Sequence, residues 1–253
     1  MPFDHPTRRI RLVVSYDGTN YHGWQVQPGL PTIQATFEQV ISEIEEAPTK
    51  AEASGRTDRY VHALAQTVAV TITNPVPVEN LVKALNRLLP KDIRVLSAEQ
   101  VPLDFHPRFD AVSKTYEYRI FRGEICPPFL RHFVLHHPYP LNEAAMRDLA
   151  PRLEGEHDFT AFAASDEKDL LGHSKVRKIF SSVVARQGDL LTYRVRGSGF
   201  LKHMVRNITG VLLEAGKGNL SEADLLARLQ PGSGIPPGPS LPGSGLFLIS
   251  VEY

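Results

Sequence analysis

Residues 8–20 read RRIRLVVSYDGTN, and this stretch sets the fold of the first half of the chain. Ile10, Leu12, Val14 and Tyr16 are apolar at every second position, which is typical of a strand with one buried face. The DGTN sequence at 17–20 predicts a turn directly after it. The chain therefore opens with a β-strand that needs other elements to cover its apolar side.

The segments that follow supply such elements. Residues 33–44 place apolar side chains at helical spacing after Thr32, a suitable N-cap, and Pro48 is expected to end this helix. Further elements are expected at 50–53 (strand), 66–72 (strand), 78–89 (helix) and 92–101 (strand). The predicted order of the first half is βαββαβ.

The second half predicts a similar order. A strand is expected at 115–121, a helix at 141–153, two strands within 174–195, a helix at 201–215 closed by Gly216, and a last strand at 245–253. The predicted fold class is α+β, with two ferredoxin-like halves built on mainly antiparallel sheets. We expect domains at 1–104 and 105–253, joined near residues 104–107.

Length and composition exclude several classes of protein. The chain has 253 residues and 42% hydrophobic residues, enough for one or two cored domains without disulfides. Its longest purely apolar run, 246–249, is far shorter than the roughly 20 residues of a membrane-spanning helix. The N-terminal MPFDHP lacks the apolar region of a secretory signal, so we expect a cytoplasmic protein. Cys126 is the only cysteine, which excludes an intramolecular disulfide.

Charge is balanced overall, with 28 basic and 28 acidic residues, but it is unevenly distributed. Between 172 and 206 there is one acid, Asp189, against eight basic residues: Lys175, Arg177, Lys178, Arg186, Arg194, Arg196, Lys202 and Arg206. This surplus predicts a surface that binds phosphates, and the alternative is ordinary solvated faces. The acidic segment 38–52 is expected to face water.

Residues 54–59, SGRTDR, form the loop with the richest chemistry. Asp58 lies between Arg56 and Arg59, and nearby guanidinium groups favour the ionised carboxylate that a nucleophile or base requires. The alternative is an aspartate that only stabilises its own turn.

Two other positions are candidates. Arg206 lies on the side of its predicted helix opposite the apolar stripe, and ordinary solvent exposure is the alternative. Tyr116 and Tyr118 share one face of a strand beside basic residues, an arrangement suited to stacking on an unpaired base. The alternative is that both tyrosines belong to the edge of the core.

No motif points to a cofactor. His132, His136 and His137 suggest a metal site, but prolines break any helix there and no carboxylate lies nearby in sequence, so a metal-dependent hydrolase is disfavoured. The zinc deaminase, P-loop and dinucleotide-binding patterns are absent from the sequence. We expect neither a cofactor nor a metal.

Five stretches together resemble one family. They are YDGTNYHGWQ at 16–25, GRTD at 55–58 with VHA at 61–63, FHPRF at 105–109, HDFTAF at 157–162 and FLKHMVRN at 200–207. In this order they resemble the bacterial tRNA pseudouridine synthases of the class called A. The resemblance runs almost from end to end.

This resemblance implies an isomerase that detaches uracil from ribose, turns it and rejoins it through carbon 5, without cofactor or metal. The implied substrates are uridines 38–40 in and beside the anticodon stem of tRNA, bound by a homodimer in a cleft where the sheets merge. Asp58 matches the essential aspartate and Arg206 the arginine that pairs with it. Tyr116 matches the tyrosine packed against the uracil, and Arg56 the residue that fills the space left by the flipped nucleotide.

The substrate-binding residues expected on this basis are Arg56, Arg59, Lys114, Lys175, Arg177, Lys202, His203 and Leu246. The chain departs from the family pattern after the aspartate, where Arg59-Tyr60 replaces the usual Ala-Gly. Ala65 also replaces the glycine before Gln66. These departures motivate an alternative function, a catalytically impaired RNA-binding protein or RNA chaperone of the same fold.

Overall fold

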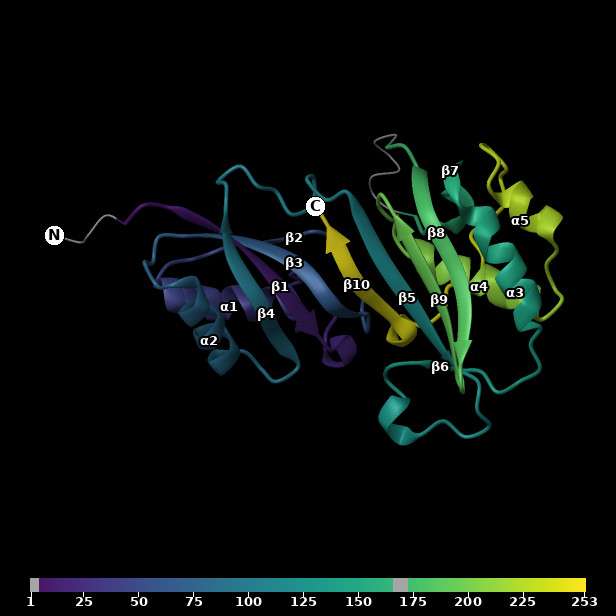
Figure 1. Ribbon diagram of the computed structural model, residues 1–253, viewed down its shortest axis with the longest axis horizontal. Helices are drawn as coiled ribbons and strands as arrows, with labels where there is room; N and C mark the ends of the chain where they lie inside the picture. Colours follow the sequence, from purple (N-terminus) through teal and green to yellow (C-terminus); the bar gives the residue numbers. More distant parts are fainter. Residues whose placement is uncertain (1–4, 166–172) are drawn as a thin grey trace. The chain divides into compact units, whose positions relative to one another are not determined.

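The computed structural model describes residues 5–165 and 173–253; residues 1–4 of the N-terminal stretch and residue 172 of the basic segment lie outside it. The chain divides into two compact units (Figure 1). Unit 1 comprises Met1–Val112 and Leu248–Tyr253, and unit 2 comprises Ser113–Phe247. Residues 105–112, expected in the second domain, group with unit 1 in this division. The domain limits 1–104 and 105–253 stay a prediction.

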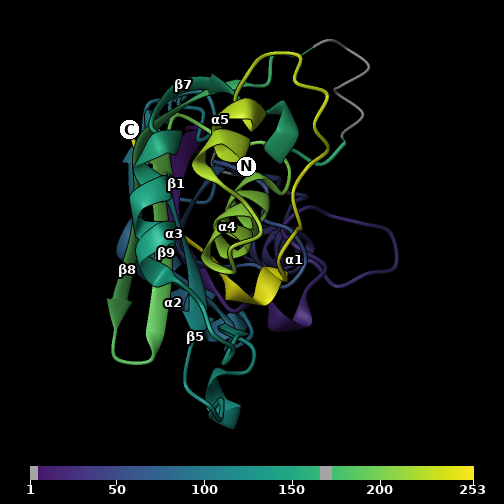
Figure 2. The same cartoon turned by 90° about the vertical axis from the view of Figure 1, so that its right-hand side faces the viewer.

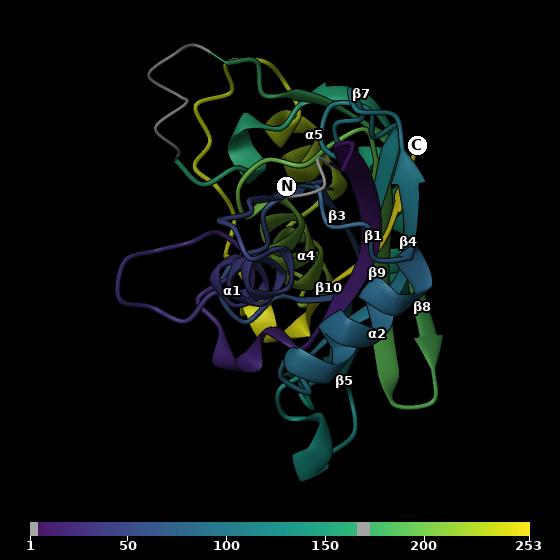
Figure 3. The ribbon, with the colours of Figure 1, turned by 90° about the vertical axis from the view of Figure 1, so that its left-hand side faces the viewer.

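Unit 1 has the predicted order βαββαβ. Its elements are β1 (Arg8–Tyr16), α1 (Ile33–Glu45), β2 (Ala51–Ala53), β3 (His62–Ile72), α2 (Val78–Leu88) and β4 (Ile93–Val101). β1 pairs antiparallel with both β3 and β4, and β2 pairs antiparallel with β3. The alternating residues Ile10, Leu12, Val14 and Tyr16 are at most 3% exposed. Both helices lie on one side of these strands (Figure 3).

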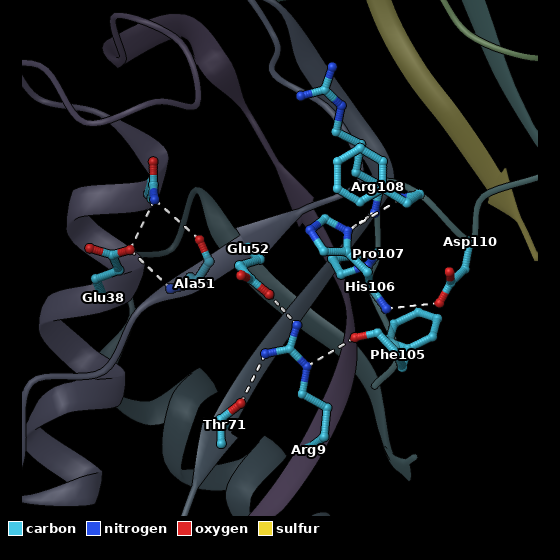
Figure 4. A network of polar contacts seen from close by, with 12 residues as sticks. Arg9, Glu38, Ala51, Glu52, Thr71, Phe105, His106, Pro107, Arg108 and Asp110 are labelled. Carbon is cyan, nitrogen blue, oxygen red and sulfur yellow. Dashed lines mark hydrogen bonds and ion pairs between the residues drawn. The ribbon is translucent and has the colours of Figure 1, made fainter. Parts of the chain in front are cut away.

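Helix α1 begins and ends for identifiable reasons. The Thr32 hydroxyl accepts a hydrogen bond from the backbone N–H of Ala35 at 3.4 Å, as an N-cap does. The helix ends at Glu45, and Glu46 takes a left-handed conformation with φ 56° before Pro48 is reached. The expectation that the acidic segment 38–52 faces water is wrong at Glu38. This residue is buried and accepts a hydrogen bond from the Ala51 N–H at 2.9 Å (Figure 4).

The other face of β1 is covered by the chain that follows β4. The Arg9 guanidinium donates to the Phe105 carbonyl at 3.2 Å and to the Thr71 hydroxyl at 2.9 Å, and it pairs with Glu52 (Figure 4). The Arg11 guanidinium lies 5.6 Å from the centre of the Phe105 ring. The FHPRF stretch is thus held on unit 1 by arginines of β1.

The strands of unit 2 follow the order β5-β9-β8-β7, with antiparallel pairing between neighbours, and they belong to one ten-stranded sheet that also includes β4, β1, β3 and β10. The elements of unit 2 are β5 (Ser113–Phe121), β6 (Leu135–His136), α3 (Glu143–Leu149), β7 (Gly155–Asp158), β8 (Val176–Gln187), β9 (Leu190–Gly197), α4 (Met204–Gly216) and α5 (Glu222–Arg228). β10 (Leu246–Glu252) starts in unit 2 and continues in unit 1. Helices α3 and α4 lie to one side of β8 and β9 (Figure 2). The α+β class with mainly antiparallel pairing is confirmed.

Helix α4 differs from its prediction at both ends and on its polar side. It starts at Met204 rather than 201 and includes Gly216. Asn207 is only 1% exposed, and a Cβ at Gly210 would lie 1.9 Å from the carbonyl oxygen of Pro239. The segment around Pro239 therefore covers the side of α4 opposite its apolar stripe.

We predict that Arg9→Ala lowers the free energy of unfolding by about 1–3 kcal/mol, because it leaves the Phe105 carbonyl and Thr71 hydroxyl without their donor. Urea denaturation measures this change. Arg87→Ala, at an exposed arginine of α2, is the control and should change stability by less than about 0.5 kcal/mol. Equal losses in the two variants would contradict the role given to Arg9.

Candidate active site

The loop that carries Asp58 joins β2 to β3 and is fastened at its first residues. The Ser54 N–H donates to the Thr67 carbonyl at 2.9 Å. The Ser54 hydroxyl donates to Gln66 Oε1 at 2.6 Å, and Gln66 Nε2 donates to the Gly55 carbonyl at 2.9 Å. Ser54 and Gln66 are fully buried. A buried side-chain amide thus holds the start of the loop against β3.

Thr57, the residue before Asp58, is held from two directions. Its side-chain oxygen lies 2.8 Å from the hydroxyl of Tyr16, and its carbonyl accepts from the backbone N–H of Trp24 at 3.0 Å. Burial raises the pKa of Tyr16 to about 12, so its hydroxyl stays protonated at neutral pH. Both residues of this hydrogen bond are buried.

Two glycines let the 16–25 stretch approach the loop closely. A Cβ at Gly18 would lie 2.1 Å from the Val61 carbonyl oxygen, and one at Gly23 would lie 2.6 Å from that of Thr57. The Gly18 N–H also donates to Nδ1 of the buried His62 at 3.0 Å. Any side chain at these glycines would push the loop away, so the glycines fix its position.

Asp58 itself begins a tight turn. The Val61 N–H donates to the Asp58 carbonyl at 3.1 Å, and Asp58 is half-buried between the buried residues Thr57 and Val61. Arg56 and Arg59 are exposed. The structure thus brings the three predicted residues of this loop together, with the carboxylate carried by a short turn whose two flanks are anchored.

Tyr60 occupies the third position of this turn with φ 66°. A left-handed conformation costs an ordinary residue about 1–2 kcal/mol and costs glycine almost nothing. The Arg59 guanidinium lies 4.4 Å from the centre of the Tyr60 ring. Tyr60 stands where the family that the chain resembles usually has glycine, and the backbone conformation at this position favours glycine.

Unit 2 contributes two tyrosines from β5 with different environments. Tyr116 is 8% exposed and meets the Phe200 ring edge-on at 5.1 Å. Tyr118 is fully buried, and its hydroxyl donates to the Pro242 carbonyl at 2.8 Å. The interpretation of Tyr118 as a base-stacking residue is wrong, because no part of its ring is accessible.

Arg206 lies in the first turn of α4. Its Nε donates to the Leu241 carbonyl at 2.6 Å and its side chain is half-buried, so it is not an ordinary solvated arginine. Lys202 and His203 precede the helix, and His203 takes a left-handed conformation with φ 60°. Leu246, at the start of β10, is buried.

Strand register divides the basic residues of unit 2 between two faces. Lys114 lies two residues from Tyr116 on β5, so it shares the face of Tyr116. Lys114 is paired with Gly197 of β9, and Gly197 is paired in turn with Ile179 of β8, so all three positions lie on the same face of the sheet. Arg177 precedes Ile179 by two residues on β8, which places it on that face too, whereas Lys175 lies directly before β8. The register therefore groups the predicted residues Lys114 and Arg177 with Tyr116.

Arg194 and Arg196 lie on the opposite face. They are paired with Glu117 and Thr115 of β5, which alternate with Tyr116. Burial raises the pKa of Glu117, but hydrogen bonds from Arg119 and Arg194 outweigh it and lower the pKa overall. The basic surplus is therefore not one surface, since part of it neutralises a buried acid on the other side of the sheet.

Among residues 5–165 and 173–253, no three His, Cys, Asp or Glu side chains are grouped so that they could hold a metal ion. Within the same ranges no helix has the length and hydropathy needed to cross a membrane.

Comparison with known proteins identifies the family. The family model described as tRNA pseudouridine synthase matches residues 12–110 and 149–253. A tRNA pseudouridine synthase A from Solibacter usitatus is 58% identical over 97% of this chain and 100% of its own length. One from an Exiguobacterium species is 42% identical over 97% and 98%. The chain belongs to the tRNA pseudouridine synthase family. The predicted family and enzyme class, an isomerase, are confirmed, and no observation favours the impaired RNA-binding protein.

As a tRNA pseudouridine synthase, the chain has site residues that sequence reasoning missed. Tyr16, Thr57 and Gln66 fix the Asp58 loop, Phe200 supports Tyr116, and the Leu241 carbonyl holds Arg206. Gln66 gave a signal as a polar residue at a core position of an apolar strand, and Tyr16, Thr57 and Phe200 lie within the stretches 16–25, 55–58 and 200–207 that carry the resemblance. The pairing of Asp58 with Arg206 stays a prediction.

We predict that Tyr16→Phe slows pseudouridine formation about tenfold, because Thr57 loses its hydrogen bond and the position of Asp58 becomes less defined. Tyr21→Phe is a matched control, since the Tyr21 hydroxyl donates to Asp92 at 2.8 Å, away from the loop. Each variant should lose about 1 kcal/mol of stability. Single-turnover rates on tRNA measure the effect, and similar slowing in both variants would refute the proposed connection.

Proposed function

We propose that this protein converts uridine to pseudouridine at positions 38–40 of the anticodon stem-loop of tRNA, with Asp58 as the essential carboxylate. The observation that carries the proposal is the anchored turn at Asp58. Its flanks are buried and hydrogen-bonded, while the carboxylate-bearing residue itself is half-buried. A catalytic group has to be held in one position by rigid neighbours, and this turn meets that requirement.

The reaction needs no group from outside the protein and its substrate. The bond from C1′ of the ribose to N1 of uracil breaks, the base turns, and a bond from C1′ to C5 forms. The proton on C5 leaves and N1 ends with a proton, so product and substrate are isomers. Asp58 acts as the ionised carboxylate in this sequence, on the ribose or on the base.

The other residues serve extrusion and orientation of the uridine. A uridine in a stem must leave its stack, which costs a few kcal/mol. Arg56, exposed two residues before Asp58, fills the vacated space. Tyr116 packs against the extruded uracil, supported by Phe200, and Arg206 orients the Asp58 carboxylate.

The tRNA backbone is bound by basic side chains. Lys114 and Arg177 share one face of unit 2, Lys175 lies directly before β8, and Lys202 and His203 precede α4. Arg59 lies beside the catalytic turn, and Leu246 supports the pocket from the start of β10. The protein works in the cytoplasm as a homodimer, with tRNA lying across both subunits and no metal or other protein needed.

We predict that Asp58→Ala folds and binds tRNA like the parent chain but forms no pseudouridine, because the reactive carboxylate is gone while its backbone hydrogen bonds remain. Carbodiimide labelling followed by primer extension on tRNA detects the product and its position. Thermal unfolding and filter binding control for folding and tRNA affinity. Undiminished product from the variant would contradict the role of Asp58.

We also predict that Lys175→Ala weakens tRNA binding and lowers the slope of log K against log salt by about 1, as the loss of one phosphate contact does. Lys178→Ala is the matched control, because Lys178 alternates with Arg177 along β8 and so lies on the opposite face, beside the Phe180 ring. Filter binding at several salt concentrations measures both slopes. A larger change in the control would refute the assignment of the binding face.

A further inference from the structure

Tyr60 combines three features in one exposed position beside the catalytic aspartate. Its backbone is left-handed with φ 66°, its side chain is 39% exposed, and it follows Asp58 by two residues. The turn is closed behind it by the Val61 N–H and the Asp58 carbonyl. An unfavourable backbone conformation at an exposed residue brings no packing benefit that would explain it, and such positions concentrate at functional sites.

The side chain of Tyr60 is already oriented by its neighbour. The Arg59 guanidinium lies 4.4 Å from the centre of the Tyr60 ring, within the range of a cation–π contact. Arg59 is itself exposed, so one side of the ring carries a positive charge that is open to solvent. The pair therefore offers an aromatic surface and a cation next to Asp58.

The turn is rigid enough to present this pair in one place. Thr57 and Val61, on either side of it, are buried. The backbone of Gly23 lies against the turn, because a Cβ there would come 3.2 Å from the Arg59 nitrogen. A change in the backbone at Tyr60 would have to move these buried neighbours, so the turn presents residues 59 and 60 in one place.

We propose that Tyr60, oriented by Arg59, stacks on the base of the nucleotide next to the uridine on which Asp58 acts. This inference rests on the proposed function. Aromatic side chains bind unpaired bases by stacking, and a nearby arginine adds attraction for the backbone phosphate. Extrusion of a uridine at the end of a stem leaves a neighbouring base without its stacking partner, and the Tyr60 ring supplies a replacement.

The test compares Tyr60→Gly with Tyr60→Phe in the Asp58→Ala background, where the substrate stays intact. Tyr60→Gly should raise the dissociation constant for an anticodon stem-loop about tenfold, the effect of removing one stacked base. Its melting temperature should stay the same or rise, because glycine accepts this φ without strain. Tyr60→Phe keeps the aromatic ring and should bind the stem-loop with the affinity of the Asp58→Ala protein. Tyr139→Ala, at a tyrosine of unit 2 that is 68% exposed, is the control and should bind as the background protein does.

A fluorescent base gives a second readout. With 2-aminopurine placed next to the target uridine, stacking on Tyr60 should quench its fluorescence in the complex, and Tyr60→Gly should remove this quenching. Unchanged affinity and quenching in Tyr60→Gly would overturn the proposal. The proposal would also be overturned if Tyr60→Gly had a lower melting temperature and Tyr60→Phe bound as weakly as Tyr60→Gly. That result would indicate a structural role for Tyr60. Pseudouridine formation by the unaltered chain tests the proposed function separately, since it requires no stacking by Tyr60.

Discussion

The buried hydrogen bond between Tyr16 and Thr57 is the constraint on which the site depends. It joins the end of β1 to the loop between β2 and β3, with both partners buried. A buried hydroxyl left without a partner costs about 1–3 kcal/mol, so the two residues hold one arrangement. Because Thr57 precedes Asp58 directly, the position of the carboxylate follows from the register of β1 and β3. The fold of unit 1 thereby sets the position of the carboxylate proposed to act on the uridine.

The regular elements could be predicted because burial repeats with the period of each element. Ile10, Leu12, Val14 and Tyr16 alternate in the sequence and are all buried on one face of β1. Elements without such a pattern could not be found: β6 and β7 are too short to show a period, and α5 has a single buried residue, Leu225. The start of α4 was placed three residues early, because a left-handed His203 cannot be read from hydropathy.

The candidate site could be predicted in part. Residue type and neighbours make Asp58 a candidate but leave open an aspartate that only stabilises its own turn, and its predicted catalytic role comes from the resemblance to the family. The supports of this loop are set by contacts between residues distant in sequence, such as Gln66 with Gly55 and Tyr16 with Thr57. The basic segment shows the same limit. A β-bulge between Ile179 and Ser181 shifts the register of β8, so counting charges along the chain could not tell which face each arginine occupies.

The turn at Asp58 also shows how a local preference of sequence can be broken without loss of the fold. Glycine is the residue that a left-handed φ favours, and this chain has Tyr60 there instead. The cost stays local, because the buried residues Thr57 and Val61 determine the path of the chain on both sides of the turn. The contact with Arg59 returns only part of that cost, since an exposed cation–π pair is worth about 0.5–1 kcal/mol. With Asp58 as the proposed catalytic carboxylate, a residue kept beside it at a net local cost is explained by what it contacts when RNA is bound, because its contact with Arg59 in the free protein does not offset that cost.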